Sequence, residues 1–350
     1  MIVHLVYNDK KFIDNYINFF NCNYSDLNNY YVLYGRGTKN DDLKFSNHKN
    51  ILVINRLYKI NKMNKAYNLF KTADKVIISG IFGIEYFLFL IRNSNIWNKI
   101  YLHFWGGDFY QFRNVSKNRY FMEFAIKKCK SLIMIEEDYK VLSKIFRLKK
   151  KYIKAIDPCY DYDINKYKKY VRYINNDQTV KFLVGNSATK ENQHIEILTK
   201  LLKFIDEDIL IYCPLSYGDM KYRNRVIKYG KEKFGNKFIP LVDFITYDEY
   251  IALISSCNIA IYNHNRQQAF GNIIMSLALG LKVFINRENT YLSLFSNIGC
   301  HVFSIFEIEN GIFNEIVNYD NTQKIENYDI ISNLKNDVIR QWEFLYTDNI

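Results

Sequence analysis

The sequence predicts an α/β protein made of two doubly wound, Rossmann-like domains. Short apolar segments of strand length alternate with longer amphipathic segments of helical period, a pattern typical of parallel sheets covered by helices. The alternation is interrupted once by a polar, basic stretch and then starts again. A chain of 350 residues is also long for a single hydrophobic core.

The first predicted domain covers residues 1–156. Its first strand, Ile2 to Tyr7, leads into a helix whose apolar residues recur every three or four positions between Lys10 and Phe20. The alternation continues with a helix from Gly80 to Arg92 and with four more strands. These strands are expected at Tyr30 to Tyr34, Ile51 to Ile54, Val76 to Ser79 and Ile100 to Trp105.

The strand that ends at Trp105 runs into Gly106, Gly107 and Asp108. Glycine lets the backbone turn sharply, so this strand delivers a carboxylate to the edge where open α/β sheets bind ligands. Asp108 is therefore a candidate general base. An aspartate at this place could equally cap the following helical turn. His103, in mid-strand, is expected to be a packed core residue.

Basic residues concentrate in two segments of the first domain. Residues 117–130 are expected to form an amphipathic helix, and residues 142–154 repeat the same mixture of basic and apolar side chains. The formal net charge of +12 favours an anionic partner. Both segments could rest on anionic lipid headgroups, although a solvated basic face would have the same composition.

Residues 157–178 are expected to link the two domains, because apolar periodicity is lost there. The second domain then covers residues 179–322. Residues 323–350 are expected to contain a C-terminal helix with apolar residues along one side. In two-domain proteins of this build, such a helix can pack back on the first domain.

Two loops of the second domain share one layout, in which a buried strand leads through polar residues to the start of a helix. The first follows Val180 to Val184 and carries Asn186 and Ser187, and the second follows Tyr262 and carries Arg266. Free amides at a helix start and a nearby guanidinium suit a diphosphate. The same polar residues could also do no more than solvate a surface turn.

Composition and cysteine spacing argue against several classes of protein. Hydrophobic residues make up 49% of the chain and charged residues 24%, so disorder is not expected. The six cysteines lie far apart without a CxxC pair, which argues against a zinc site and favours a reducing cytoplasm. We expect the N-terminus to be a strand rather than a signal peptide, and no uncharged apolar run has the ~18 residues of a membrane span.

Four groups of residues follow one another between about positions 100 and 290. They are His103-Phe-Trp-Gly-Gly-Asp-Phe-Tyr110, Val184-Gly-Asn-Ser187 with Asn192-Gln-His-Ile195, Arg266-Gln-Gln268 with Gly271, and Asn286-Arg-Glu-Asn289. They resemble, in the same order, motifs of the TDP-N-acetylfucosamine:lipid II N-acetylfucosaminyltransferases, glycosyltransferase family 56. One departure is Gly107, where the family motif has alanine. Pro214 to Gly218 is similar to a further loop of that family.

The resemblance implies the GT-B architecture, in which two Rossmann-like domains face a central cleft. It implies transfer of a 4-acetamido-4,6-dideoxyhexose from a TDP-sugar to a polyprenyl-diphosphate-linked saccharide, by a protein bound peripherally at the cytoplasmic face of the bacterial inner membrane. It also implies that Asp108 is the base. The residues that it assigns to the nucleotide sugar are Asn186, Ser187, His194, Tyr217, Arg266, Gln267, Gln268, Gly271, Asn272 and Asn289.

Inverting transfer without a metal or another cofactor is expected. Retaining GT-B enzymes often carry a glutamate shortly before the glycine that ends the donor-site helix, and Met275 stands there in this chain. Asn40-Asp-Asp42 lies in a polar connection and not at the end of a strand. Three alternatives stay open: a GT-B transferase with a UDP-linked donor, a nucleotide-sugar epimerase of the same fold, and a basic nucleic-acid-binding protein, the last disfavoured because most aromatic residues fall in strands and amphipathic helices.

Overall fold

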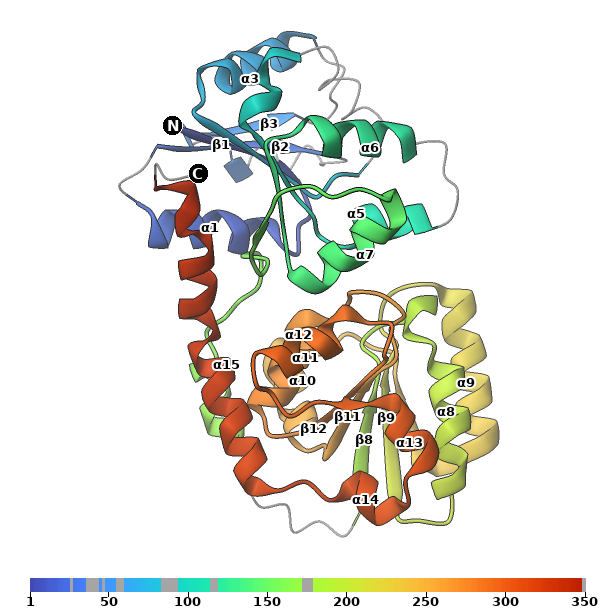
Figure 1. Ribbon diagram of the computed structural model, residues 1–350. Coiled ribbons are helices and arrows are strands. Elements are labelled where there is room, and N and C mark those ends of the chain that lie inside the picture. The colour runs from blue at the N-terminus through green and yellow to red at the C-terminus, as the bar shows by residue number, and fades with distance from the viewer. Residues whose placement is uncertain are drawn as a thin grey trace. The chain divides into compact units, whose positions relative to one another are not determined.

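The computed structural model describes residues 1–25, 28–35, 44–45, 48–54, 60–82, 94–113, 119–171 and 179–347. The chain divides into two compact units, Met1–Asp161 with Asn336–Ile350 (the first unit) and Tyr162–Lys335 (the second unit). Each contains one parallel sheet (Figure 1). Most of the expected helix from Gly80 to Arg92, and all of Asn40 to Asp42, lie outside the described residues. Among the helices that are described, none has the length and apolar character needed to cross a membrane.

The sheet of the first unit has the strand order β3-β2-β1-β4-β5-β6-β7. Because the chain builds outward from β1 in one direction and from β4 in the other, the strand order reverses between β1 and β4. The strands are β1 (Ile2–Tyr7), β2 (Asn29–Tyr34), β3 (Ile51–Ile54), β4 (Lys75–Ser79), β5 (Ile100–His103), β6 (Ser131–Met134) and β7 (Tyr152–Lys154).

Side chains of β1 alternate between the two faces of this sheet, as the pleat requires. Val3 and Leu5 join the core beneath α3 (Ile60–Thr72) and α6 (Arg119–Lys128), and His4 contacts α1 on the other face. Further helices described in this unit are α1 (Ile13–Asn23), α5 (Gly107–Tyr110) and α7 (Glu136–Phe146).

The second basic segment is divided between a helix and a strand. Residues 142–154 do not form one amphipathic helix, because α7 ends at Phe146 and the chain re-enters the sheet as β7. Arg147 has a positive φ of 51°, which breaks the helical path. The first basic segment contains the predicted helix as α6, bounded by Arg119 and Lys128.

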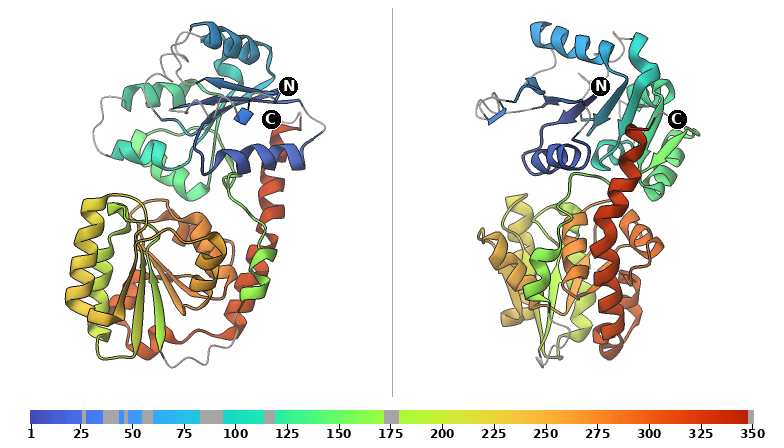
Figure 2. Two further views of the ribbon diagram at one scale, coloured as in Figure 1. Left: turned by 180° about the vertical axis from the view of Figure 1, so that it is seen from behind. Right: turned by 90° about the vertical axis from the view of Figure 1, so that its left-hand side faces the viewer.

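The second unit repeats the architecture with the strand order β10-β9-β8-β11-β12-β13. Its strands are β8 (Val180–Val184), β9 (Ile209–Pro214), β10 (Phe238–Leu241), β11 (Ile259–Tyr262), β12 (Lys282–Ile285) and β13 (Phe303–Ser304). Figure 2 shows this sheet between α8 and α9 on one face and α10, α11 and α12 on the other. The helices are α8 (His194–Leu201), α9 (Met220–Phe234), α10 (Tyr247–Ser255), α11 (Phe270–Ala278), α12 (Thr290–Asn297), α13 (Ile305–Asn310) and α14 (Phe313–Val317).

The last long helix, α15 (Asn321–Trp342), begins in the second unit and ends in the first. Its final residue, Trp342, is fully buried, packs edge-on against Phe20 and His103, and donates its indole N–H to the carbonyl of Ile156 at 2.8 Å. Lys75 donates to the carbonyls of residues 344, 345 and 347, which satisfies acceptors that the end of a helix leaves open. The C-terminal segment is therefore part of the core of the first unit.

Candidate active site

The strand order of the second unit reverses between β8 and β11, which pair in parallel from Ile259 with Phe182 to Ile261 with Val184. Ligands of open α/β sheets bind at such a reversal, beyond the carboxyl ends of the strands. The loop after β8 and the loop after β11 leave the sheet side by side at this point. They are the two loops that the sequence predicts to bind phosphate.

The loop after β8 is closed by the side chain of Asn192. Its Oδ1 accepts from the amide of Asn186 at 2.9 Å, and its Nδ2 donates to the hydroxyls of Thr189 at 2.8 Å and Ser187 at 3.2 Å. Gly185, with a φ of +72°, starts the turn, and a Cβ on it would lie 2.5 Å from His194 Nε2. A glycine is thus required where the loop folds over the first residue of α8.

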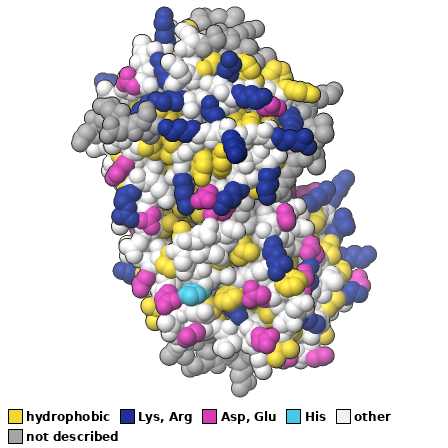
Figure 3. Space-filling model, in the orientation of Figure 1, with side chains coloured by type: hydrophobic (Ala, Val, Ile, Leu, Met, Phe, Trp, Pro, Cys, Tyr) yellow, Lys and Arg dark blue, Asp and Glu magenta, His cyan; other side chains and the backbone are white. Residues whose placement is uncertain are grey.

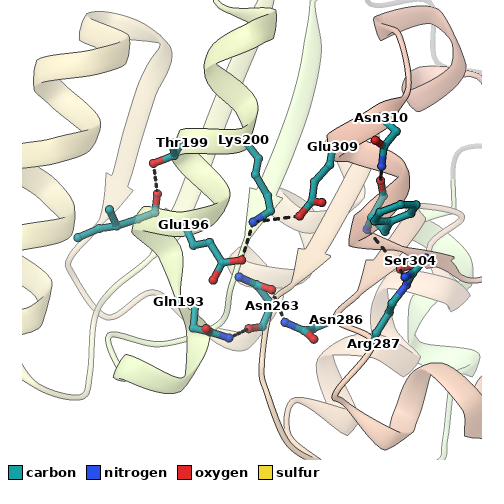
Figure 4. A network of polar contacts seen from close by, with 12 residues as sticks. Gln193, Glu196, Thr199, Lys200, Asn263, Asn286, Arg287, Ser304, Glu309 and Asn310 are labelled. Carbon is teal, nitrogen blue, oxygen red and sulfur yellow. Dashed lines mark hydrogen bonds and ion pairs between the residues drawn. The ribbon is translucent and has the colours of Figure 1, made fainter.

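Two hydrogen bonds join the loop after β11 to the loop after β8. The Nε2 of His264 lies 3.2 Å from Asn186 Oδ1, and Gln193 donates from Nε2 to the carbonyl of Asn263 at 2.7 Å. Asn286, after β12, donates to Asn263 Oδ1 at 2.6 Å. Figure 4 shows Gln193 and Asn286 reaching Asn263 from opposite sides. The ends of β8, β11 and β12 are thereby fixed to one another.

The loop after β11 ends at Ala269, whose positive φ of 69° turns the chain into α11. Arg266 is partly exposed and donates from Nη1 to the carbonyl of Gln267 at 3.2 Å. Gly271 lies in the first turn of α11, where backbone amides have no acceptor within the helix. Asn272, one residue later, accepts from the hydroxyl of Tyr250 at 3.0 Å.

Tyr217 and Asn289 lie at neighbouring strand ends. Tyr217, after β9, is 44% exposed, and its carbonyl accepts from the amide of Ala188 at 2.7 Å. Asn289, after β12, is fully buried, accepts from the amide of Tyr291 at 3.1 Å and so caps α12. The structure therefore gives Asn289 a structural contact, whereas the phenol of Tyr217 remains open to solvent.

The two histidines of this edge are uncharged at neutral pH. His194 and His264 are completely buried, and loss of solvent lowers the pKa of each imidazole from its usual 6.5 to about 3. His194 contacts Tyr222 through Nδ1 at 3.3 Å. Neither ring can therefore attract a phosphate by charge, and both act through neutral hydrogen bonds.

Several buried polar atoms at this edge have no hydrogen-bond partner among the residues that the structure describes. They are His194 Nε2, Asn263 Nδ2, His264 Nδ1, Gln267 Oε1 and Gln268 Oε1. Native proteins usually satisfy buried polar atoms, and a concentration of exceptions marks a place where a ligand or ordered water completes the bonding. The set contains both donors and acceptors, so it suits a ligand that also carries both.

In the first unit, Asp108 is fully buried in α5, and its carboxylate accepts from the amides of Ile81 at 3.0 Å and Trp105 at 3.2 Å. The cap of α5 is Gly106, so Asp108 is not the helix cap that its position could also indicate. Burial raises the pKa of this carboxyl to about 6, and the amide hydrogen bonds oppose that rise. His103, as predicted, is a buried core residue.

A second buried carboxylate, Asp157, was not predicted as a site residue. It accepts from the amide of Cys159 at 3.1 Å, and burial, together with the charge of Asp108, raises its pKa to about 7. Two donors at the same edge of the sheet, Asn8 Nδ2 after β1 and Trp105 Nε1 after β5, have no partner in the described part of the chain. The edge of the first unit thus combines carboxylates with unpartnered donors.

The family profile of the 4-alpha-L-fucosyltransferases, glycosyl transferase group 56, matches residues 15–343. The chain belongs to this family. The resemblance carried by the four motifs is confirmed, and this family 56 member is a sugar-transferring enzyme.

Solved structures support the fold of the family 56 chain. Sucrose-phosphate synthase from Thermosynechococcus elongatus is similar with a TM-score of 0.68 and 10% identity, covering 99% of this chain and 98% of its own. A glycosyltransferase from Rickettsia africae gives 0.61 and 16%, covering 97% and 92%. Anabaena HepE in complex with UDP-glucose gives 0.59 and 14%, covering 98% and 96%. The predicted GT-B type, with two parallel-sheet Rossmann-like domains, is confirmed.

Sequence reasoning missed three residues that shape this site: Asn192, Asn263 and His264. Asn192 was visible within a family motif, but the motif does not say that its side chain closes the loop. His264 and Asn263 sit beside Arg266 in an evident polar loop. Their position directly after a buried strand was the available signal.

Proposed function

We propose that the enzyme transfers a 4-acetamido-4,6-dideoxyhexose, with inversion, from a TDP-sugar to a polyprenyl-diphosphate-linked saccharide. Membership of family 56 supports the class of sugar and of reaction. The observation that carries the proposal is the reversal of strand order between β8 and β11, where two joined loops present amides, a guanidinium and unpartnered polar atoms. A nucleotide diphosphate sugar needs this combination.

The roles within the donor site follow from the place of each residue along the edge of the sheet. Asn186 and Ser187, on the loop after β8, and Arg266, on the loop after β11, would hold the diphosphate. Gly271 lets a phosphate approach the first amides of α11, and Tyr217 would lie against the nucleobase. Gln267, Gln268 and Asn272 would contact the sugar or the diphosphate, and His194 and Asn289 would support these loops from behind.

Asp108 is proposed as the base that takes the proton of the acceptor hydroxyl. With a pKa raised to about 6 by burial, it is ionised at neutral pH and remains basic enough to accept a proton in the transition state. The amides of Ile81 and Trp105 fix its orientation. The leaving diphosphate would be stabilised by Arg266 and by the start of α11.

The lipid-linked acceptor places the enzyme, in this proposal, at the cytoplasmic face of the bacterial inner membrane. On the face shown in Figure 3, lysine and arginine side chains gather over the first unit. Those of α6 and the turn after it include Lys127, Lys128 and Lys130, all exposed, next to the exposed aromatic rings of Tyr120 and Phe124. Basic side chains with exposed aromatics suit an anionic lipid surface.

The proposal is tested first by a thermal-shift panel of TDP, UDP and GDP, followed by turnover with sugars linked to the preferred nucleotide. TDP should raise the melting temperature most, and transfer should follow from a TDP-sugar. A preference for UDP would change the proposed donor to a UDP-sugar and would leave the proposed reaction unchanged. If no nucleotide changed the melting temperature and the protein eluted from heparin in modest salt, a nucleic-acid-binding role would be favoured instead.

Metal independence is tested by turnover in excess EDTA. Because Arg266 and helix amides can neutralise the leaving diphosphate, activity should persist after chelation. Complete loss of activity that Mg²⁺ restores would contradict this part of the proposal. Free nucleotide binding measured in the same buffers would separate an effect on donor binding from an effect on the chemical step.

A further inference from the structure

The imidazole of His264 has one nitrogen engaged and one open. Its Nε2 lies 3.2 Å from Asn186 Oδ1, and a carbonyl oxygen can only accept, so Nε2 carries the hydrogen of this bond. The ring is fully buried, and burial, followed by the nearby His194 and Arg266, lowers its pKa to about 3. At neutral pH the imidazole therefore carries only one N–H hydrogen, which is on Nε2. Nδ1 has no hydrogen and can only accept a hydrogen bond.

Nδ1 is buried and has no hydrogen-bond partner among the described residues. Gln267 Oε1, on the same loop, is a second buried acceptor without a partner there, while Asn263 Nδ2 is a donor. The oxygens of an ionised diphosphate only accept hydrogen bonds. A diphosphate could satisfy Asn263, but it leaves His264 and Gln267 unsatisfied. The group that meets His264 must bring an O–H or an N–H.

The order of the strands indicates which part of the ligand supplies the O–H or N–H that meets His264. Along the edge of the sheet, Tyr217 lies in the loop after β9, Asn186 and Ser187 lie in the loop after β8, and His264 lies in the loop after β11. Neighbouring strands are about 4.8 Å apart, so these residues mark successive positions across the site. With the nucleobase at Tyr217 and the diphosphate at the loop after β8, the next position belongs to the sugar.

We propose that His264 Nδ1 accepts a hydrogen bond from a hydroxyl or an amide N–H of the donor's sugar, so that His264 contacts the sugar while Arg266, further along the same loop, holds the diphosphate. This inference rests on the proposed function, because it requires a nucleotide diphosphate sugar as donor. It makes His264 a residue for donor specificity, which neither the family match nor the predicted site assigns.

Two substitutions separate the two ring nitrogens. In His264→Gln the side-chain amide reaches the place of Nε2, so the bond to Asn186 is kept and the acceptor at Nδ1 is lost. In His264→Asn the amide occupies the place of Nδ1, so the acceptor is kept and the bond to Asn186 is lost. Each variant is the control for the other, because both replace a neutral buried ring with a neutral amide.

The experiment measures, by isothermal titration, the Kd of TDP and of a TDP-linked hexose for the wild type and for both variants, with UDP and a UDP-hexose run in parallel. The readout is the ratio of the two Kd values, which isolates the contribution of the sugar. In His264→Gln the Kd of the TDP-hexose should rise about tenfold relative to the Kd of TDP, or by about 1.4 kcal/mol. The Kd of TDP itself should stay nearly unchanged. In His264→Asn both affinities should fall together and the ratio should stay at the wild-type value.

Each other outcome contradicts the inference in a distinct way. An unchanged ratio in His264→Gln would show that ordered water satisfies Nδ1, and a parallel loss of TDP and sugar nucleotide would show that the residue serves the phosphates. If His264→Gln melts far below the wild type, His264→Asn decides, because a ratio altered in that variant contradicts a sugar contact at Nδ1. A wild type that binds neither nucleotide would overturn the proposed function together with this inference.

Discussion

In the first unit, buried polar side chains form a connected chain across the middle of the sheet, whereas in the second unit they gather in the loops beyond its edge. Asn29, His4, Tyr16, Ser79 and His103 are linked in that order by contacts of 3.3, 3.1, 3.0 and 3.0 Å. All five are buried. A polar chain satisfied in this way fixes the packing of β1, β4, β5 and α1 and leaves little for a ligand to do.

The second unit has the same reversal of strand order but an apolar sheet centre. The inner residues of β8 and β11, such as Leu183 and Ile261, are fully buried hydrocarbons. Polar atoms without partners in the described part of the chain, among them Asn263 Nδ2 and His264 Nδ1, lie in the loop that follows β11. The comparison teaches that hydrogen bonds are completed in the middle of the first sheet, whereas unpartnered polar atoms lie beyond the strand ends of both units, where a ligand can complete their bonding.

If the first unit supplies the base and the second binds the donor, Asp108→Asn should have the largest effect. An amide keeps the shape of the carboxylate but cannot take the proton, so turnover should fall by about 100-fold or more, with TDP affinity unchanged. In the wild type, turnover should also decline as pH drops through about 6, because the carboxylate is then protonated. Initial rates across pH and calorimetric titration with TDP check both expectations.

The control for Asp108→Asn is Asp157→Asn, which alters another buried carboxylate of the first unit. It also accepts a backbone amide, so it reports the structural cost of such a change. Turnover of Asp157→Asn should stay within about threefold of the wild type. Normal turnover in Asp108→Asn would remove the base assignment, and a drop in melting temperature that parallels the loss of activity would reduce Asp108 to a structural residue.

The next largest effect is a loss of stability, which is expected in the first unit alone. Trp342→Ala removes a fully buried indole and should cost about 3 to 5 kcal/mol of stability. Trp342→Phe keeps most of the packing but leaves the carbonyl of Ile156 without its donor, so it should cost about 1 to 3 kcal/mol. Tyr120→Ala, at a residue 80% exposed, should change stability by no more than about 0.5 kcal/mol.

Hydrogen exchange of peptides from β1 and β8 measures the effect of Trp342→Ala in each unit separately. Protection should fall in β1 and its neighbours and persist in β8. Equal losses in both strands would mean that the units unfold together, and the comparison between them would then describe their chemistry but not their stability.

A smaller effect is expected from Arg266→Ala, which should raise the Kd for TDP by about 10-fold to 100-fold, since hydrogen bonds to charged groups contribute about 1.5 to 3 kcal/mol. Affinity for the lipid-linked acceptor should not change. The matched control is Arg287→Ala, which removes the same charge from an exposed residue that contacts Ser304 (Figure 4) and lies over the ring of Phe306. Equal weakening in both variants would point to general electrostatic attraction and not to a contact by Arg266.

The sequence predicts elements well where one local pattern decides them. Val180 to Val184 is an apolar run that ends in glycine, and it forms β8 with the expected bounds. The end of α7 was missed because it depends on Arg147, a residue that rarely adopts positive φ, and on pairing between β7 and β6. The link between Asn186 and His264 spans 78 residues. No local pattern carries such a contact, although the polar loops on which it lies were predicted.

The smallest expected effect concerns pH and stability, and it again compares the units. Each holds two fully buried histidines whose pKa is lowered by burial to about 3, His4 and His103 in the first and His194 and His264 in the second. Their folded pKa lies below the unfolded value of 6.5, so the stability that they contribute is complete above pH 6.5 and is lost as pH falls. At pH 5 each should cost up to about 2 kcal/mol.

The first unit contains an opposing pair, Asp108 and Asp157, whose pKa is raised to about 6 and about 7. A carboxyl whose pKa is higher in the folded state than in the unfolded state destabilises the folded protein at neutral pH. This destabilisation becomes smaller as the pH falls and the carboxyl takes up its proton. Acidification from pH 7 to 5 should therefore weaken the second unit more than the first. Hydrogen exchange of β1 and β8 at the two pH values, corrected for the intrinsic rate, measures this. A larger loss in β1 would mean that the polar chain through His4 and Tyr16 protonates more readily than its burial indicates.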